Sequence, residues 1–220
     1  MYQWDFGSLW TYRWLFVNGL GLTVAFTIAI VVLGLVAGMI FGLAKLSRFA
    51  PLRWLTIGVS EVFRCTPVLV QLVWFYYALP ILTGIEISAT LASILALSLY
   101  GGSFYGEIIR GGIVSIDSGQ TEAGTALGMT PIQTMRRIIL PQALKRMVPP
   151  LMNQSIIQFK NTSLVSVLAV PDLLYQGQVA AHDSYRPLEI YTLVALIYFV
   201  VLLPLTLLVQ WGEKRLATSD

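Results

Sequence analysis

Five long stretches of apolar residues constrain this chain more than any other feature of its sequence. A helix needs about 20 mostly apolar residues to cross the hydrocarbon core of a bilayer, and each stretch reaches that length. Lipid offers no hydrogen-bond partner to the backbone, and a helix satisfies its N–H and C=O groups internally. We therefore predict an all-α integral membrane protein with five transmembrane helices. The expected spans are residues 19–43, 59–79, 88–109, 148–169 and 190–211.

The composition agrees with a membrane protein. Hydrophobic residues make up 56% of the 220 residues and charged residues 11%, whereas a soluble domain is about a quarter charged. The single cysteine, Cys65, excludes a disulfide framework, and the single histidine, His182, leaves little for a metal site. The segments between the spans are too short to fold separately. We expect residues 1–220 to form one transmembrane domain, with no cleaved signal at the N-terminus.

The distribution of Lys and Arg predicts the orientation of the spans. Cytoplasmic segments of membrane proteins carry an excess of these residues. Ten lie after the first, third and fifth spans, whereas the segments on the other side hold only Arg13 and Arg186. We therefore expect the N-terminus outside and the C-terminus in the cytoplasm. The ten residues are Lys45, Arg48, Arg53, Arg110, Arg136, Arg137, Lys145, Arg146, Lys214 and Arg215.

Two binding functions are excluded by pattern. The isoelectric point near 9.1 could indicate a nucleic-acid partner, but the basic residues are scattered among apolar runs, and so we expect no nucleic acid. None of the four lysines is followed by Ser or Thr, so the chain has no G-x-x-x-x-G-K-[ST] phosphate loop. We expect no cofactor on this chain and no binding of ATP by that route.

The largest cytoplasmic segment, residues 110–147, is predicted to contain two short helices. The first covers residues 120–127 and ends at Gly128, which suits a left-handed backbone. The second begins after Thr130, with Pro131 at its first position and Gln133 completing a capping box. This helix-turn-helix lies between two membrane spans and has no long basic face. It is therefore expected to dock a cytoplasmic partner.

Polar residues line one face of the fourth span. They would be costly in lipid, so they should face protein or a wet cavity, where they either contact a substrate or hydrogen-bond to neighbouring helices. Lys160 lies near the bilayer midplane but points away from this face at 100° per residue. Either the helix unwinds near residues 161–163 or Lys160 serves another surface. The polar residues are Gln154, Gln158, Thr162 and Ser166, with Asn161 beside them.

The second span begins with a charged pair, Glu61 and Arg64, three residues apart on a helical face. Pro67 follows and should kink the helix. The pair is interpreted as an ion pair at the membrane interface or as the brace of a gate.

Glycines recur every fourth residue in the first span, at Gly34, Gly38 and Gly42. They place one small face along the helix and allow another backbone to approach closely. This face is predicted to pack against a helix, either of the same chain or across a subunit interface.

The sequence of the cytoplasmic segment resembles the EAA loop of ABC importer permeases. The resemblance rests on Glu122–Pro131, which reads EAGTALGMTP, and on the ILPQA of Ile139–Ala143. Other stretches are similar to the polar amino-acid branch of that family, and the similarity covers nearly the whole chain. These stretches are FRCTPVLVQ at 63–71, YGEIIRG at 105–111 and KNTSL at 160–164.

This resemblance implies the partners and the mechanism. In the family, the permease pairs with an identical or paralogous second subunit and receives its substrate from a periplasmic or extracellular binding protein. The EAA helix enters a groove of separate ABC ATPase subunits, which bind ATP and Mg²⁺. Localisation in the bacterial cytoplasmic membrane follows. The resemblance implies that Glu122, Ala123, Ala126 and Gly128 sit in the groove and that Leu127 and Met129 supply apolar contact, with Gly124 replacing the usual alanine.

The substrate pathway is assigned to Gln154, Gln158, Lys160, Asn161 and Thr162. Family members often carry an acidic residue at the position of Asn161. Its absence argues against a cationic amino acid and favours an acidic or neutral polar one. A deep Lys160 would suit a carboxylate.

Two other functions compete with the importer. The sequence Gly101–Ser103 resembles the short G-x-S motif of intramembrane serine hydrolases. In such an enzyme, His182 would have to act as the base. A channel or secondary transporter would also fit a polar span, but neither needs a coupling loop.

Overall fold

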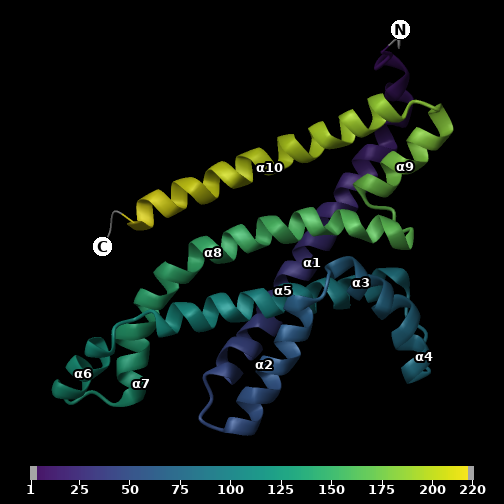
Figure 1. Ribbon diagram of the computed structural model, residues 1–220. Helices are drawn as coiled ribbons and strands as arrows, with labels where there is room; N and C mark the ends of the chain where they lie inside the picture. The colour runs from purple at the N-terminus through teal and green to yellow at the C-terminus, as the bar shows by residue number, and fades with distance from the viewer. Residues whose placement is uncertain (1–3, 218–220) are drawn as a thin grey trace.

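The computed structural model describes residues 4–217, with side chains up to residue 214, so residues 1–3 and 218–220 of the expected domain and the side chain of Arg215 lie outside it. The described chain is helical throughout, apart from short connections (Figure 1). The α-helices are α1 (Arg13–Lys45), α2 (Ala50–Cys65), α3 (Val68–Val73), α4 (Leu79–Thr83), α5 (Ala89–Val114), α6 (Ser118–Ala126), α7 (Pro131–Thr134), α8 (Leu140–Asn161), α9 (Leu173–Ser184) and α10 (Pro187–Ala217). The 3₁₀ helices are η1 (Gly7–Tyr12) and η4 (Thr162–Leu168), and the π-helices are η2 (Trp74–Ala78) and η3 (Met135–Ile139).

Three of these helices are long and apolar enough to cross a membrane alone: α1 together with η1, α5 and α10. Two bent pairs raise the number of possible spans to five. One pair is α2 with α3–α4, and the other is the long helix from α7 to η4 with α9. The α1–α2 connection, α6–α7 and the C-terminal end of α10 lie at one end of the molecule, and the N-terminus and α9 lie at the other (Figure 1).

The expected span over residues 59–79 is broken into separate helices rather than kinked. The chain breaks at Thr66, whose backbone is extended, and it bends by 106° between α2 and the segment from α3 to α4. Thr66 turns its hydroxyl back onto the carbonyl of Val62, and Pro67 has no N–H with which to continue the helix. The side-chain amide of Gln71 donates to the carbonyls of Phe63 and Thr66, at 2.8 and 2.9 Å, and holds the elbow. The sequence predicted a kink and the structure has a full break.

The expected fourth span, residues 148–169, remains helical but changes type. The α-helical part of α8 ends at Asn161, and the chain tightens into η4 up to Leu168 rather than unwinding at residues 161–163. Ala169 then takes a left-handed conformation with φ 56°, and α9 departs at 47°. His182, which lies between the fourth and fifth expected spans, belongs to α9.

The glycine face of α1 packs against α5 within the same subunit. A Cβ atom added to Gly38 would lie 2.5 Å from the Cβ of Tyr105, and one added to Gly42 would lie 2.9 Å from the carbonyl oxygen of Gly106. Tyr105 has no exposed surface, and its hydroxyl meets Ser155 of α8 at 2.9 Å. Packing inside the chain therefore explains these glycines without a subunit interface.

Gly38→Ala should destabilise the chain by about 1–3 kcal/mol, because the added methyl group would overpack the contact with Tyr105. Gly21→Ala in the same helix is the matched control, since a Cβ there meets nothing within 4 Å and alanine is the better helix former. Thermal unfolding of both variants in lipid nanodiscs provides the measurement. Equal midpoints for the two variants would contradict the assigned packing.

Candidate functional site: the coupling element and the polar helix α8

The turn between α6 and α7 has the geometry that the sequence predicts. Gly128 adopts φ 74°, where only glycine is free of strain. Its N–H donates to the carbonyl of Thr125 at 2.9 Å, and the N–H of Met129 donates to that of Gly124 at 3.0 Å. This pair of bonds is a Schellman motif, which satisfies the last carbonyls of α6. The prediction that α6 ends at Gly128 is confirmed.

The start of α7 is a complete capping box, as predicted. Thr130 Oγ1 accepts from the N–H of Gln133 at 3.3 Å, and Gln133 Oε1 accepts from the N–H of Thr130 at 2.9 Å. The two helices then pack closely, because a Cβ at Gly124 would lie 2.6 Å from Oγ1 of the buried Thr134. The EAA pattern that this segment resembles has alanine at the position of Gly124. Here Thr134 of α7 leaves no room for the methyl group of an alanine.

The predicted coupling residues lie together on the surface of this element. Glu122, Ala123 and Ala126 are exposed on α6, Gly128 is exposed at the turn and Met129 is half-buried beside it. The most exposed of the large apolar side chains here are those of Leu127, at 77%, and Ile132, at 72%. Ile132 belongs to this face but was not singled out from the sequence. Its position one residue after Pro131, on the first turn of α7, could have indicated it.

The start of α6 is capped, and it lies close to a contact between α8 and the end of α5. Asp117 Oδ1 accepts from the N–H of Gly119 at 2.6 Å and caps α6. Arg146 of α8 donates to the carbonyl of Ser115, next to α5, at 2.5 Å. Arg146 therefore ties α8 to the segment between α5 and α6.

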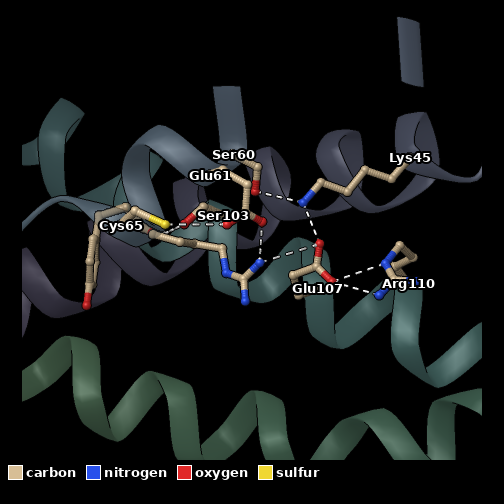
Figure 2. Close-up of polar contacts among 9 residues, drawn as sticks. Lys45, Ser60, Glu61, Cys65, Ser103, Glu107 and Arg110 are labelled. Atoms are coloured by element: carbon tan, nitrogen blue, oxygen red, sulfur yellow. Dashed lines mark hydrogen bonds and ion pairs between the residues drawn. The ribbon is translucent and has the colours of Figure 1, made fainter. Parts of the chain in front are cut away.

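A network of charged side chains joins α1, α2 and α5 (Figure 2). Lys45 Nζ lies 2.5 Å from Glu107 Oε1 and donates to Ser60 Oγ at 2.7 Å. The Lys45 side chain is only 1% exposed, so its charge depends on these partners. Glu107 Oε2 also accepts from Arg110 at 2.9 Å. The carboxylate of Glu107 thus pairs with two cationic side chains, those of Lys45 and Arg110.

The predicted pair of Glu61 and Arg64 connects to the same network. Arg64 Nη1 lies 2.6 Å from Glu61 Oε1 and 4.0 Å from Glu107 Oε1. Lys45 and Glu107 were missed as site residues. An acidic residue inside a span is costly without a partner, and this signal, applied to Glu107, could have found the pair.

Glu107→Gln should cost about 3 kcal/mol or more, because it leaves the buried ammonium of Lys45 without its counter-charge. The double variant with Lys45→Met should recover much of that loss. Glu61→Gln is the control, since its partly exposed pair is expected to contribute at most about 1 kcal/mol. A double variant less stable than either single variant, in chemical or thermal unfolding, would contradict the pairing.

The polar stripe of α8 is turned into the protein. Gln158 and Thr162 have no exposed surface, and Gln154 and Ser166 are also buried. Gln158 Nε2 donates to the carbonyl of Leu97 in α5 at 2.8 Å, and it fits there because Gly101 lacks a side chain. Gln158 therefore fills a contact between α8 and α5, and the other side chains of the stripe are buried as well.

Another face of α8 is open. Lys160 is exposed, Asn161 is half-buried beside it, and Asn153 is exposed seven residues, or two turns, before Lys160. Asn161 Nδ2 donates to Gln158 Oε1 at 3.1 Å, which links the open face to the buried stripe. Asn153 was not predicted, although its spacing from Lys160 puts the two residues on one face.

The hydrolase residues are not brought together. Ser103 is buried in α5 and donates to the carbonyl of Tyr100 at 2.7 Å. His182 is exposed on α9, with its ring 6.3 Å from that of Tyr185. A serine–histidine dyad is not formed by these residues.

Comparison with known proteins relates nearly the whole chain to one family of membrane proteins. Residues 30–218 match the family of the binding-protein-dependent transport system inner membrane component. The arginine transport system permease protein ArtQ of Bacillus subtilis is 35% identical over 93% of each chain. The glutamate/aspartate import permease protein GltK of Escherichia coli O6:H1 is 35% identical over 99% of this chain and 100% of the relative.

A solved structure agrees with these relatives. The crystal structure of an amino acid ABC transporter with histidines superposes with a TM-score of 0.91 and 37% identity, over 97% of this chain and 100% of that chain. The relatives are permease proteins of transport systems, and the serine-hydrolase alternative receives no support from them. The chain is therefore a multi-pass protein of the bacterial inner membrane that belongs to the family of inner membrane components of binding-protein-dependent transport systems.

Proposed function

We propose that this chain is the pore-forming permease subunit of an ATP-driven importer of a polar amino acid. It acts as one transmembrane domain of five spans, two of them bent, with the N-terminus outside and the C-terminus in the cytoplasm. The grouping of the α1–α2 connection, α6–α7 and the end of α10 at one end of the molecule supports this orientation (Figure 1). The excess of Lys and Arg in these segments supports it independently.

The exposed apolar face of α6–α7 is the observation that supports an ATPase partner. Leu127 and Ile132 project from an element that is well capped, yet they remain exposed among the residues that the structure describes. Large apolar side chains of this kind mark an interaction site. ABC ATPase subunits that bind ATP and Mg²⁺ would cover this face, and the exposed Glu122 would enter the groove with it. This chain itself carries out no hydrolysis.

Two further partners complete the proposed importer. A second permease subunit, identical or paralogous, would face this one, because a pathway needs walls on both sides of α8. A binding protein outside the membrane would deliver the amino acid at the end that holds the N-terminus and α9. The family description, which names binding-protein-dependent transport, supports this partner.

Lys160 and Asn161 are proposed to line the pathway, with the buried residues Gln154, Gln158 and Thr162 supporting that wall. The open face of α8 lies toward the proposed second subunit, where an ammonium can meet the carboxylate of a substrate. Since Asn161 adds no negative charge, the proposed substrates are acidic or neutral polar amino acids. The two relatives, named for arginine and for glutamate and aspartate, are equally similar to the chain and do not decide between substrates.

Transport in proteoliposomes should require the ATPase, and Leu127→Ala should lower the affinity for the ATPase about tenfold or more, because an exposed leucine buries its side chain on docking. Gly128→Val should abolish stimulated hydrolysis, since valine is strained at φ 74°. Leu52→Ala, at an exposed position of α2, is the matched control and should leave binding unchanged. Uptake that continues without the ATPase would favour a channel or secondary transporter instead.

Asn161→Asp should weaken uptake of an acidic amino acid at least tenfold relative to a cationic one, because it places a carboxylate beside Lys160. Lys160→Met should reduce uptake of every amino acid that is held by its carboxylate. Asn18→Asp, an exposed amide on α1 away from this face, is the matched control. The measurement is uptake with competing amino acids, in variants shown to assemble and to hydrolyse ATP. Unchanged preference in both α8 variants would place the pathway elsewhere.

A further inference from the structure

Arg13 and Arg186 belong to segments at the end of the molecule that holds the N-terminus (Figure 1). Arg186 is paired with acidic side chains, at 3.0 Å from Glu189 and 3.9 Å from Asp5. The backbone N–H of Asp5 also donates to Glu189 at 3.2 Å, which holds the N-terminal segment beside the start of α10. The charge of Arg186 is therefore balanced within the chain.

Arg13 has no acidic partner in the part of the chain that the structure describes. Residues 1–3 contain no acidic side chain either. Asp183 of α9 accepts from the hydroxyl of Tyr12 at 2.7 Å and forms no ion pair with Arg13. Basic residues are scarce on this side of the expected membrane, so an unbalanced one calls for an anion from outside the chain.

The guanidinium group of Arg13 is positioned by its own neighbours. Its Nη1 atom donates to the carbonyl of Trp10 at 2.9 Å. Its Cζ atom lies 5.3 Å from the ring centre of Trp10 and 5.8 Å from that of Trp14, within the range of a cation–π contact. A guanidinium has five N–H donors, so most of them remain available. Arg13 therefore presents a fixed cation on an exposed surface.

The aromatic side chains around Arg13 indicate its depth. Trp4, Phe6, Trp10 and Trp14 are all exposed. Aromatic residues of this kind gather at the membrane–water interface, where the lipid headgroups lie. The candidate span formed by η1 and α1 also begins here, at Gly7. Arg13 is thus expected at the level of the lipid phosphates.

A hollow of about 300 Å³ lies beside Arg13, between the N-terminal segment and α10. Apart from Arg13 its lining is apolar. Leu193 lies six residues after Pro187, the start of α10, and Ile197 lies ten residues after it, which places them about 9 and 15 Å along the helix. The hollow therefore runs from a cation at the interface toward the hydrocarbon core. Its apolar lining residues are Phe6, Leu9, Trp10, Phe16, Leu193 and Ile197.

The two parts of this site match the two parts of a phospholipid. A planar guanidinium binds phosphate oxygens in pairs, and the apolar wall suits an acyl chain. A free phosphate ion would leave the hollow unused, and an uncharged lipid would leave Arg13 without an anion. A protein helix would fill the hollow but would balance Arg13 only if it also carried a suitably placed acid.

We propose that Arg13 and the hollow bind one phospholipid, with the phosphate on the guanidinium group and one acyl chain against Leu193 and Ile197. An anionic headgroup should bind best, because no amine offsets its phosphate charge. The bound lipid joins the start of α1 to α10. The inference requires only that this end of the chain lies at a membrane surface, and it does not depend on which substrate is transported.

The test is photo-crosslinking of the full-length chain in dodecyl maltoside micelles, which contain no phosphate. The two probes are phosphatidylglycerol and diacylglycerol that carry the same diazirine-labelled acyl chain, and mass spectrometry identifies the labelled peptides. Phosphatidylglycerol should label residues 193–197 about fivefold more than diacylglycerol does, because one arginine near the membrane surface contributes about that factor toward an anionic lipid. Arg13→Gln should remove this preference. Ile197→Trp should reduce labelling of the hollow by both probes, because the indole fills it.

Arg48→Gln is the matched control, since Arg48 is an exposed arginine in the connection between α1 and α2, at the opposite end of the molecule. This variant should keep the preference at residues 193–197. Equal labelling by the two probes in the natural chain would overturn the proposal, as would a preference that survives in Arg13→Gln. Absence of label at residues 193–197 with both probes would also overturn it and would indicate that protein covers the hollow.

Discussion

The close contact of α1 with α5 sets the geometry of the remaining helices. Gly38 and Gly42 let the backbone of α1 approach α5 until Tyr105 and Gly106 touch it. This approach brings Lys45, the last residue of α1, against Glu107, which directly follows Gly106 in α5. In lipid no hydrophobic effect drives two helices together, so small residues and polar bonds supply the attraction. The glycines provide the fit and the ion pair fixes the register.

The same contact positions the charged side chains at the end of α5. Glu107 forms ion pairs with Lys45 and Arg110 and lies 4.0 Å from Arg64. These contacts hold the end of α5 to α1 and α2. Beyond that point the chain leaves the bundle for α6–α7, and Arg146 ties α8 back to the end of α5. A rigid frame thus presents a small, exposed apolar face. Two backbone hydrogen bonds, from Gly128 and Met129 to carbonyls of α6, hold the turn beside this face.

The polar residues of α8 divide into two groups with different tasks. Gln158 satisfies a backbone carbonyl of α5 and stabilises the bundle, whereas Lys160 remains open for a partner or a substrate. Asn161 bonds to Gln158 and stands between the two groups. Asp172, which follows η4, caps the N-terminus of α9.

Short-range features of the sequence determined the helices of this chain. In the segment between α5 and α8 they also determined where the short helices end and begin. Apolar length predicted the helices, Gly128 and the Thr130 capping box predicted the α6–α7 turn, and the EAA-like pattern indicated the family that the comparisons support. These features depend on neighbours within a few residues, so they can be inferred without the fold. Only the tertiary structure decided which faces are buried. Periodicity places Gln154, Gln158 and Thr162 on one side of a helix but does not say whether that side meets α5 or a cavity. The break at Thr66, the pairing of Lys45 with Glu107, and the hollow beside Arg13 likewise depend on contacts between residues far apart in the chain.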